Sequence, residues 1–307
     1  VECAAAAFLI AMAGYTASYR RYFLQIPETA RVKPRWRRFQ MRLPERLERL
    51  ESLLLPSRFQ RAFYHFTLRA LLRSEVHTLC IGAFTGAGLV IASSKAVTAI
   101  SEEALNESSV PGAGLLSIPL IIAYFMLAGI RCSFELPAEL RANWVFRMTV
   151  DEQKHEAGAV ARKVMLSFLL PWQLGICMPA YIYTAGVLTG LLHTAMVLTL
   201  SLLLMDILLL RFRKAPFTCP LPALKNSFGL TLFTFAFGMY AFTAFASQVE
   251  RWMLLQPLRF VLFYAAAGAG WFVLGRIRRD TPDVDLKLTF EDEPEGAVQT
   301  LNLMNLE

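Results

Sequence analysis

The chain has 307 residues, of which 55% are hydrophobic and 18% charged, and its mean hydropathy is +0.43. This composition points away from a pair of soluble domains. The net charge of +7 would suit a nucleic-acid-binding protein, but the positions of the bases exclude the need for such a partner. Nearly all Lys and Arg residues lie in segments between or after apolar runs, as the positive-inside rule expects of a membrane protein. The exceptions are Lys95, Arg251 and Arg259.

The five cysteines are widely scattered and form no CxxC pair. The spacing therefore predicts neither a zinc site nor a disulfide framework, and we expect no metal and no cofactor. Small apolar packing residues are the simplest interpretation of these side chains.

The first apolar run, residues 3–19, follows Glu2 and ends at the basic pair Arg20 and Arg21. It could be the apolar region of a signal peptide, but a positively charged start is missing. We expect residues 1–19 to form a first membrane span, in a chain whose upstream part could be missing.

Residues 20–75 form a basic segment in which we expect two amphipathic helices. The first would extend from Pro44 to Pro56, and the second would begin after Ser57, a suitable N-cap. Such helices would lie along an anionic cytoplasmic leaflet, where each base contributes about 1 kcal/mol. A soluble subdomain that packs on itself is the alternative. Bases recur at every fourth position of the second helix: Arg61, His65, Arg69, Arg73 and His77.

The second and third spans are expected at residues 76–100 and 111–130, joined by an external loop that is acidic. Span two contains Gly82 and Gly86, a GxxxG pair that permits close helix packing. Lys95 lies near the outer end of span two, where its side chain can extend toward the polar loop.

The second cytoplasmic loop, residues 131–163, contains the stretch Phe-Glu-Leu-Pro-Ala-Glu-Leu-Arg at 134–141 and a mixed-charge helix at 151–163. We expect Glu135 and Arg141 to contact a partner or lipid there, together with Arg61, Arg69 and Arg73 of the second amphipathic helix.

Residues 164–210 contain a single Asp, Glu, Lys or Arg residue, Asp206, and are long enough for two spans. Glycines at 186 and 190 predict the turn between them. Residues 211–225 form a third basic loop that contains three prolines.

Span six is expected at residues 227–249, and Glu250 with Arg251 marks a short external loop before span seven at 258–275. The chain is thus predicted to be an all-α, polytopic bundle of about seven spans with six of them in residues 76–279. Its N-terminus would be outside and its C-terminus in the cytoplasm. The polar tail, residues 280–307, alternates with period two, which could give a β-hairpin, or it is a solvated tail.

Familiar catalytic motifs are absent, since the chain has no GxxxxGK[ST], HExxH or GxSxG sequence. An enzyme is therefore disfavoured. Ionisable residues inside spans are the default functional candidates, because the bilayer makes them costly. These are Lys95, His193 and Asp206. The structural alternative for Lys95 is a side chain that extends to the membrane surface, and for His193 it is a neutral, hydrogen-bonded ring. For Asp206 it is an interfacial ion pair with Arg211.

Pro171 and Pro179 interrupt span four and release backbone carbonyls, and Gln173 adds a polar side chain between them. Broken helices line substrate sites in many transporters. We therefore predict a transport pathway that involves Pro171, Gln173, Pro179 and Asp206, with ordinary prolines of a membrane helix as the alternative.

The stretch Leu-Arg-Ala-Leu-Leu-Arg-Ser at 68–74 and the stretch at 134–141 resemble uncharacterised bacterial multi-span proteins likened to ABC-2-type permeases. The resemblance implies an export permease of the inner membrane, powered by a separate ATPase that touches the cytoplasmic loops. The alternatives are a non-transporting scaffold that docks a soluble partner and a membrane-embedded lipid-modifying enzyme. A homodimer is left open.

Overall fold

The computed structural model describes residues 54–103, 111–136, 156–210 and 228–279. The chain divides into the units Val1–Leu54 and Leu55–Glu307, and the helices from Arg58 onward belong to the second unit. The described residues form helices and no strand, which confirms the all-α prediction for this part of the chain. Three predicted features lie outside the described residues: the first span at 1–19, the amphipathic helix at 44–56 and the tail at 280–307.

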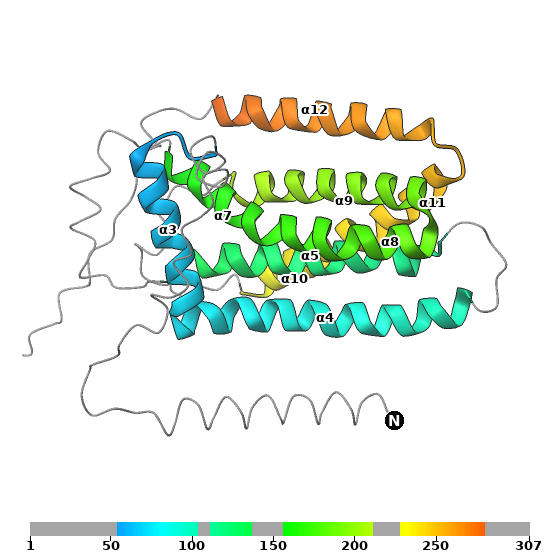
Figure 1. Cartoon of the computed structure of the whole chain (residues 1–307), viewed down its shortest axis with the longest axis horizontal. Helices are drawn as coiled ribbons and strands as arrows, with labels where there is room; N and C mark the ends of the chain where they lie inside the picture. The colour runs from blue at the N-terminus through cyan, green and yellow to red at the C-terminus, as the bar shows by residue number, and fades with distance from the viewer. Residues whose placement is uncertain (1–53, 104–110, 137–155, 211–227, 280–307) are drawn as a thin grey trace, which may run out of the picture. The chain divides into compact units, whose positions relative to one another are not determined.

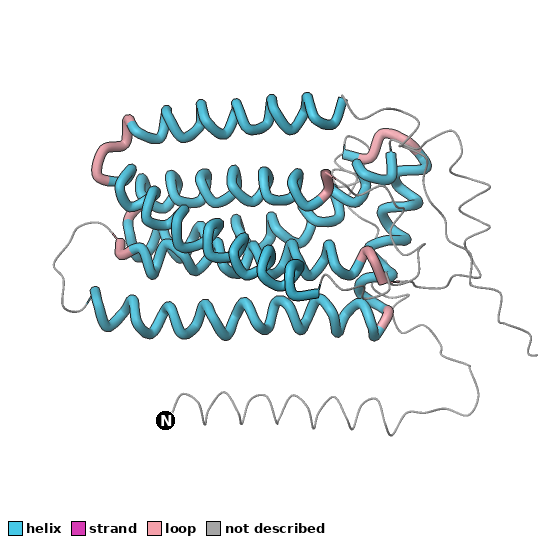
Figure 2. Tube along the Cα trace, turned by 180° about the vertical axis from the view of Figure 1, so that it is seen from behind, coloured by secondary structure: helices cyan, strands magenta, loops and turns pink. Residues whose placement is uncertain are grey.

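Within the described ranges, two π-helical turns join pairs of consecutive helices. Turn η3 (Gln173–Cys177) joins α7 to α8, and turn η4 (Ala241–Phe245) joins α10 to α11. Helices α4, α5, α8, α9 and α12 extend along one common direction, whereas α3 lies across one end of them (Figure 1). The same crossing is visible from behind (Figure 2). The bounds are α3 (Arg58–Arg73), α4 (Glu75–Glu103), α5 (Ala113–Ser133), α7 (Glu156–Trp172), α8 (Met178–Ala185), α9 (Val187–Leu208), α10 (Phe228–Tyr240), α11 (Ala246–Leu254) and α12 (Arg259–Arg279).

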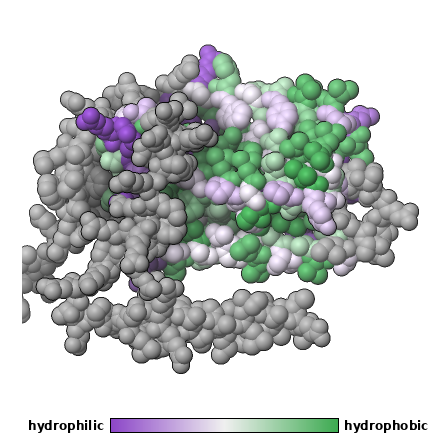
Figure 3. All heavy atoms as spheres, in the orientation of Figure 1, coloured by the Kyte–Doolittle hydropathy of each residue, from purple (hydrophilic) through white to green (hydrophobic). Residues whose placement is uncertain are grey.

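Five helices of the described part are long and apolar enough to cross a bilayer. Helix α5 is the central one, with a mean hydropathy of 2.2 and 78% of its most apolar window buried by the other helices. In α12 the mean hydropathy of the most apolar window is 1.6, but only 11% of that window is buried. Apolar residues cover the flanks between the more polar ends (Figure 3). So much exposed apolar surface is unusual for a soluble protein and suits lipid. The predicted span at 227–249 is present as α10, η4 and α11, but it is not among these five.

Helices α4 and α5 pack antiparallel and in close contact, through glycines other than the predicted pair. A Cβ atom added at Gly88 would lie 2.8 Å from the Cβ of Phe125, and one at Gly129 would lie 2.7 Å from the Cβ of Phe84. Gly82 and Gly86 have open space where a Cβ would be. Among the described residues the GxxxG pair is therefore not a packing site, because these glycines face away from the contact between α4 and α5.

The predicted hairpin of residues 164–210 is confirmed as α7, α8 and α9. Its turn is a single residue, Gly186, whose φ of 86° and ψ of 163° fall in a region open almost only to glycine. Gly190 lies one turn into α9, and a Cβ there would be 2.7 Å from the backbone nitrogen of Ile182. The two glycines therefore act differently: the first reverses the chain, and the second lets α8 and α9 touch.

Helix α3 begins as predicted, because the Ser57 hydroxyl accepts a hydrogen bond from the Gln60 amide at 3.0 Å. Phe63 and Leu71 are buried against the bundle. The helix ends at Ser74, so the predicted stripe of bases is divided between two helices. His77 belongs to α4, is buried, and contacts the Ser74 hydroxyl and the Leu136 carbonyl rather than the surface.

Candidate functional site

The predicted break in span four is the π turn η3, which lies between the two prolines. Pro179 lacks an amide hydrogen and cannot form the α-helical hydrogen bond to the Gly175 carbonyl. The amide of the preceding residue, Met178, donates to the carbonyl of Gln173, five residues earlier, which is the π-helical pattern. Both prolines are exposed. Gln173 points into the bundle and is fully buried, and neither its amide oxygen nor its amide nitrogen has a hydrogen-bond partner. Of these three residues, Gln173 alone faces the interior.

Asp206 belongs to a charged cluster at the end of the bundle that α3 crosses, which we call the basic end. Its carboxylate pairs with Arg162 of α7 and lies 3.8 Å from Arg278 of α12. Arg131 of α5 donates to the nearby Leu208 carbonyl at 3.0 Å. The pairing with Arg211 that the sequence suggested falls outside the described residues. The observed partner Arg162 comes from a neighbouring helix, which spacing along the chain cannot reveal.

The four predicted pathway residues do not gather at one site. Helices α7 and α8 are antiparallel to α9, with Ile182 opposite Gly190 at one end and Arg162 opposite Asp206 at the other. Gln173 therefore lies between the two ends. The prolines face outward, and Asp206 is engaged by arginines at the basic end.

The predicted partner or lipid contacts that belong to the described residues also lie at the basic end. Arg69 and Arg73 are exposed on α3, whereas Arg61 is half-buried and its Nε atom is buried without a partner. Glu135 forms a 2.8 Å ion pair with Arg131. Arg141 lies outside the described residues.

A second buried polar group lies toward the opposite end of the bundle, where α9 meets α11. The Nδ1 atom of His193 is 2.6 Å from the Oε1 atom of Glu250, and the exposed fractions of the two side chains are 1% and 0%. The ring of Tyr181 lies against that of His193 with the centroids 4.2 Å apart, and its hydroxyl donates to the Leu115 carbonyl at 2.6 Å. Side chains or backbone of α5, α8, α9 and α11 thus meet at one acid–base pair.

The His193–Glu250 pair is surrounded by apolar side chains and is incompletely hydrogen-bonded. His193 Nε2 and Glu250 Oε2 are both buried and have no hydrogen-bond partner. Burial of polar atoms without partners is costly, and such atoms are rare in native proteins. The surrounding buried cluster consists of Leu120, Met196, Val197, Ala246, Met253 and Phe260.

The sequence-based placement of Glu250 in an external loop is wrong. Helix α11 continues to Leu254 and buries Ala246, Ser247, Glu250 and Met253. One extra residue rotates a helix by about 100°, so the π turn η4 decides which face of α11 meets α9. The i, i+4, i+7 spacing of 246, 250 and 253 is a signal that could have placed Glu250 on a buried helical face.

Further buried polar residues line the interior between the pair and the basic end. The hydroxyls of Thr194, Thr199, Thr243 and Ser247 each donate to a carbonyl of their own helix, which satisfies them locally. The Ser201 hydroxyl, like Gln173, is buried without a partner. Within the described residues, no three His, Cys, Asp or Glu side chains are placed to hold a metal ion.

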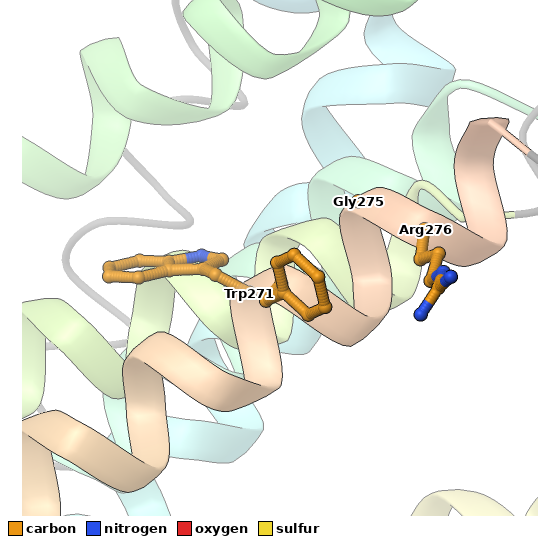
Figure 4. Close-up of a pocket in the computed structure, with 4 residues that line it drawn as sticks. Trp271, Gly275 and Arg276 are labelled. Carbon is orange, nitrogen blue, oxygen red and sulfur yellow. The ribbon is translucent and has the colours of Figure 1, made fainter.

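A surface hollow on α12 is lined by Trp271, Phe272, Gly275 and Arg276. The side chains of Trp271 and Arg276 extend to either side of the small residue Gly275 (Figure 4). An aromatic ring beside an arginine near the basic end of a span is typical of a membrane interface. This hollow therefore fits lipid contact better than a catalytic site.

No family model, curated protein or solved structure matches this chain. The class of the protein therefore follows from the structure itself: in its described part it is a helical bundle with five helices that are long and apolar enough to span a bilayer and with polar groups in its interior.

Proposed function

We propose that the protein is the membrane-spanning, permease-like subunit of a transport system in a bacterial inner membrane. The observation that carries this proposal is that buried polar atoms without partners occur inside the long helices, among them those of Gln173, Ser201, His193 and Glu250. Ionisable and polar groups inside membrane helices are costly, and those that are kept usually bind or conduct something. The basic end of the described bundle, with α3 and Arg131, Arg162 and Arg278, would face the cytoplasm.

The resemblance to ABC-2-type permeases adds a separate ATPase to this proposal. Its contact surface would be the exposed face of α3, which carries Arg69 and Arg73, together with the stretch at 134–141. In such an arrangement the ATPase would move α3, and α3 packs directly on α4 and α7.

Inside-out vesicles test the transport proposal, because they keep partner proteins in place and admit ATP. Vesicles that contain the wild-type chain or the Gln173→Leu variant at equal amounts would be offered a panel of solutes of different charge and size. We expect at least one solute to accumulate only with the wild-type chain, and to require ATP if the partner is an ATPase. Gln173→Leu should slow this flux severalfold, whereas Gln248→Leu, at an exposed position, should not. Equal accumulation in vesicles that lack the chain, for every solute, would contradict the proposal.

A non-transporting scaffold is the second candidate, and the exposed side of α3 favours it. Arg69 and Arg73 are exposed there, and so are the apolar residues Phe66 and Leu72. A soluble protein that is recovered with the wild-type chain but lost in Arg69→Glu with Arg73→Glu, in the absence of any flux, would support the scaffold.

A further inference from the structure

We propose that the His193–Glu250 pair is a proton-binding site that takes its proton from the aqueous side opposite the basic end and couples transport to proton movement. This inference rests on the proposed function and names the coupling ion. It stands on geometry: an acid and a base in contact at 2.6 Å, fully buried, each with one polar atom left without a partner.

The two unpartnered atoms are the positions that can accept the proton. With a neutral imidazole, Nδ1–H donates to the Glu250 carboxylate, and the pair has a charge of −1. One proton from water adds either to Nε2, which gives an imidazolium–carboxylate pair, or to Oε2, which gives an imidazole beside a carboxylic acid. Either product is neutral overall. No bond other than the new N–H or O–H forms, and release to water restores the charge of −1.

No fixed positive charge of the described residues balances Glu250. Among the helices around the pair, α8 contributes Tyr181, which is bonded to Leu115, and α12 contributes Tyr264, which lies close enough to Glu250 to interact electrostatically. On α11 itself Arg251 is exposed. Arg259 of α12 is held on Trp252, with its guanidinium carbon 3.9 Å from the ring centroid and a 2.7 Å bond to the Trp252 carbonyl. On α4 the ionisable groups near this level are Lys95, which is exposed, and the acidic residues Glu102 and Glu103 at the end of the helix. Helix α5 has no Asp, Glu, Lys, Arg or His near this level, since its Arg131 lies at the basic end.

The location of the pair connects proton binding to helix packing. His193 is seven residues after the Gly186 turn, about 10 Å along α9, and Glu250 is four residues before the end of α11. An unbalanced charge within the apolar cluster is unfavourable, whereas the neutral pair fits it. Proton occupancy should therefore shift the equilibrium between a closed contact of α9 with α11 and a more hydrated one.

Proton uptake by the purified full-length protein in lipid nanodiscs tests the site without any knowledge of the transported solute. The protein would be titrated between about pH 8 and about pH 5, the range in which histidine chemistry operates, with an indicator that counts protons. We expect Glu250→Gln to take up one proton per chain fewer than the wild type. The matched control is Glu75→Gln, which removes an exposed carboxylate of α4 at the basic end, remote from the pair, and should leave the count unchanged. Identical counts for Glu250→Gln and wild type would overturn the proposal.

A measurement on the wild-type chain keeps the proposal testable if Glu250→Gln does not fold. The ring ¹⁵N signals of the four histidines would be followed over the same pH range, with His193 assigned by its loss in His193→Gln. We expect His193 Nε2, or the Glu250 carboxyl seen by infrared spectroscopy, to gain a proton on acidification. A His193–Glu250 pair that keeps one protonation state throughout would contradict the site. If the pair binds protons but no solute is transported, the transport proposal is refuted and the proton-binding site stands. If solute is transported but the pair binds no proton, the proton-binding site is refuted and the transport proposal stands.

Discussion

Two acid–base groups in the described part of the bundle have different surroundings. At the basic end, the side chains of Arg162, Asp206 and Arg278 are 33%, 12% and 51% exposed. His193 and Glu250, toward the other end, are 1% and 0% exposed. The open cluster can exchange its partners for water or lipid headgroups, so each contact contributes little. The closed pair has no water or headgroup within reach to replace a lost partner, so removal of one side chain leaves the other buried without its hydrogen bond. Burial, rather than the residue types, makes the second group the candidate site.

The closed pair should give the largest loss of stability when it is broken. Glu250→Ala leaves His193 buried without its partner, and we expect a loss of about 3–5 kcal/mol in the free energy of unfolding. His193→Leu with Glu250→Leu should recover much of that loss, since apolar residues of similar volume fit the surrounding cluster. The measurement is equilibrium unfolding in mixed micelles, and the control variant is Arg251→Ala, which changes the exposed residue next to Glu250. A loss for Glu250→Ala no larger than that for Arg251→Ala would remove the distinction between the two groups.

The α8–α9 hairpin, which holds Tyr181 against His193, should be the next most sensitive feature. Gly190→Ala places a methyl group 2.7 Å from the Ile182 nitrogen, and the helices must separate, at a cost of about 1–3 kcal/mol. Gly86→Ala has open space and should stabilise α4 by about 0.5–1 kcal/mol. Both variants can be compared by thermal loss of helical circular dichroism. Equal melting temperatures would show that α8 and α9 do not touch as described.

The open cluster should give the smallest effect. Asp206→Asn removes the carboxylate between two partly exposed arginines, and we expect a loss of about 1 kcal/mol or less. The loss should shrink as salt is raised, because exposed charges are screened. Unfolding measured at low and high ionic strength checks this. A salt-independent loss as large as that of Glu250→Ala would place Asp206 in a closed site.

The sequence was sufficient to predict the features that depend on local chemistry. The N-cap at Ser57, the reversal at Gly186 and the break near Pro179 each follow from the backbone demands of one or two residues. Features that depend on which helix face meets which neighbour were not predictable in this way. The role of Gly88, rather than Gly82 and Gly86, depends on the rotation of α4 against α5.

Glu250 shows the same limit at the candidate site. Its neighbours in sequence, Val249 and Arg251, are typical of the end of a span, and this favoured an external loop. Its burial depends on the π turn η4 and on His193, which is 57 residues away in the chain. The pattern of 246, 250 and 253 contains part of this information, but only when the helix is continued past the apolar run.

We propose that the bundle crosses a bilayer with its basic end in the cytoplasm, and cysteine labelling of intact cells tests this orientation most directly. The five native cysteines would be replaced, and single cysteines placed at Leu258, which is 85% exposed at the far end, and at Arg73 on α3. We predict that an impermeant maleimide labels Leu258→Cys in intact cells and labels Arg73→Cys only after lysis. Labelling of Arg73→Cys from outside intact cells would contradict the account.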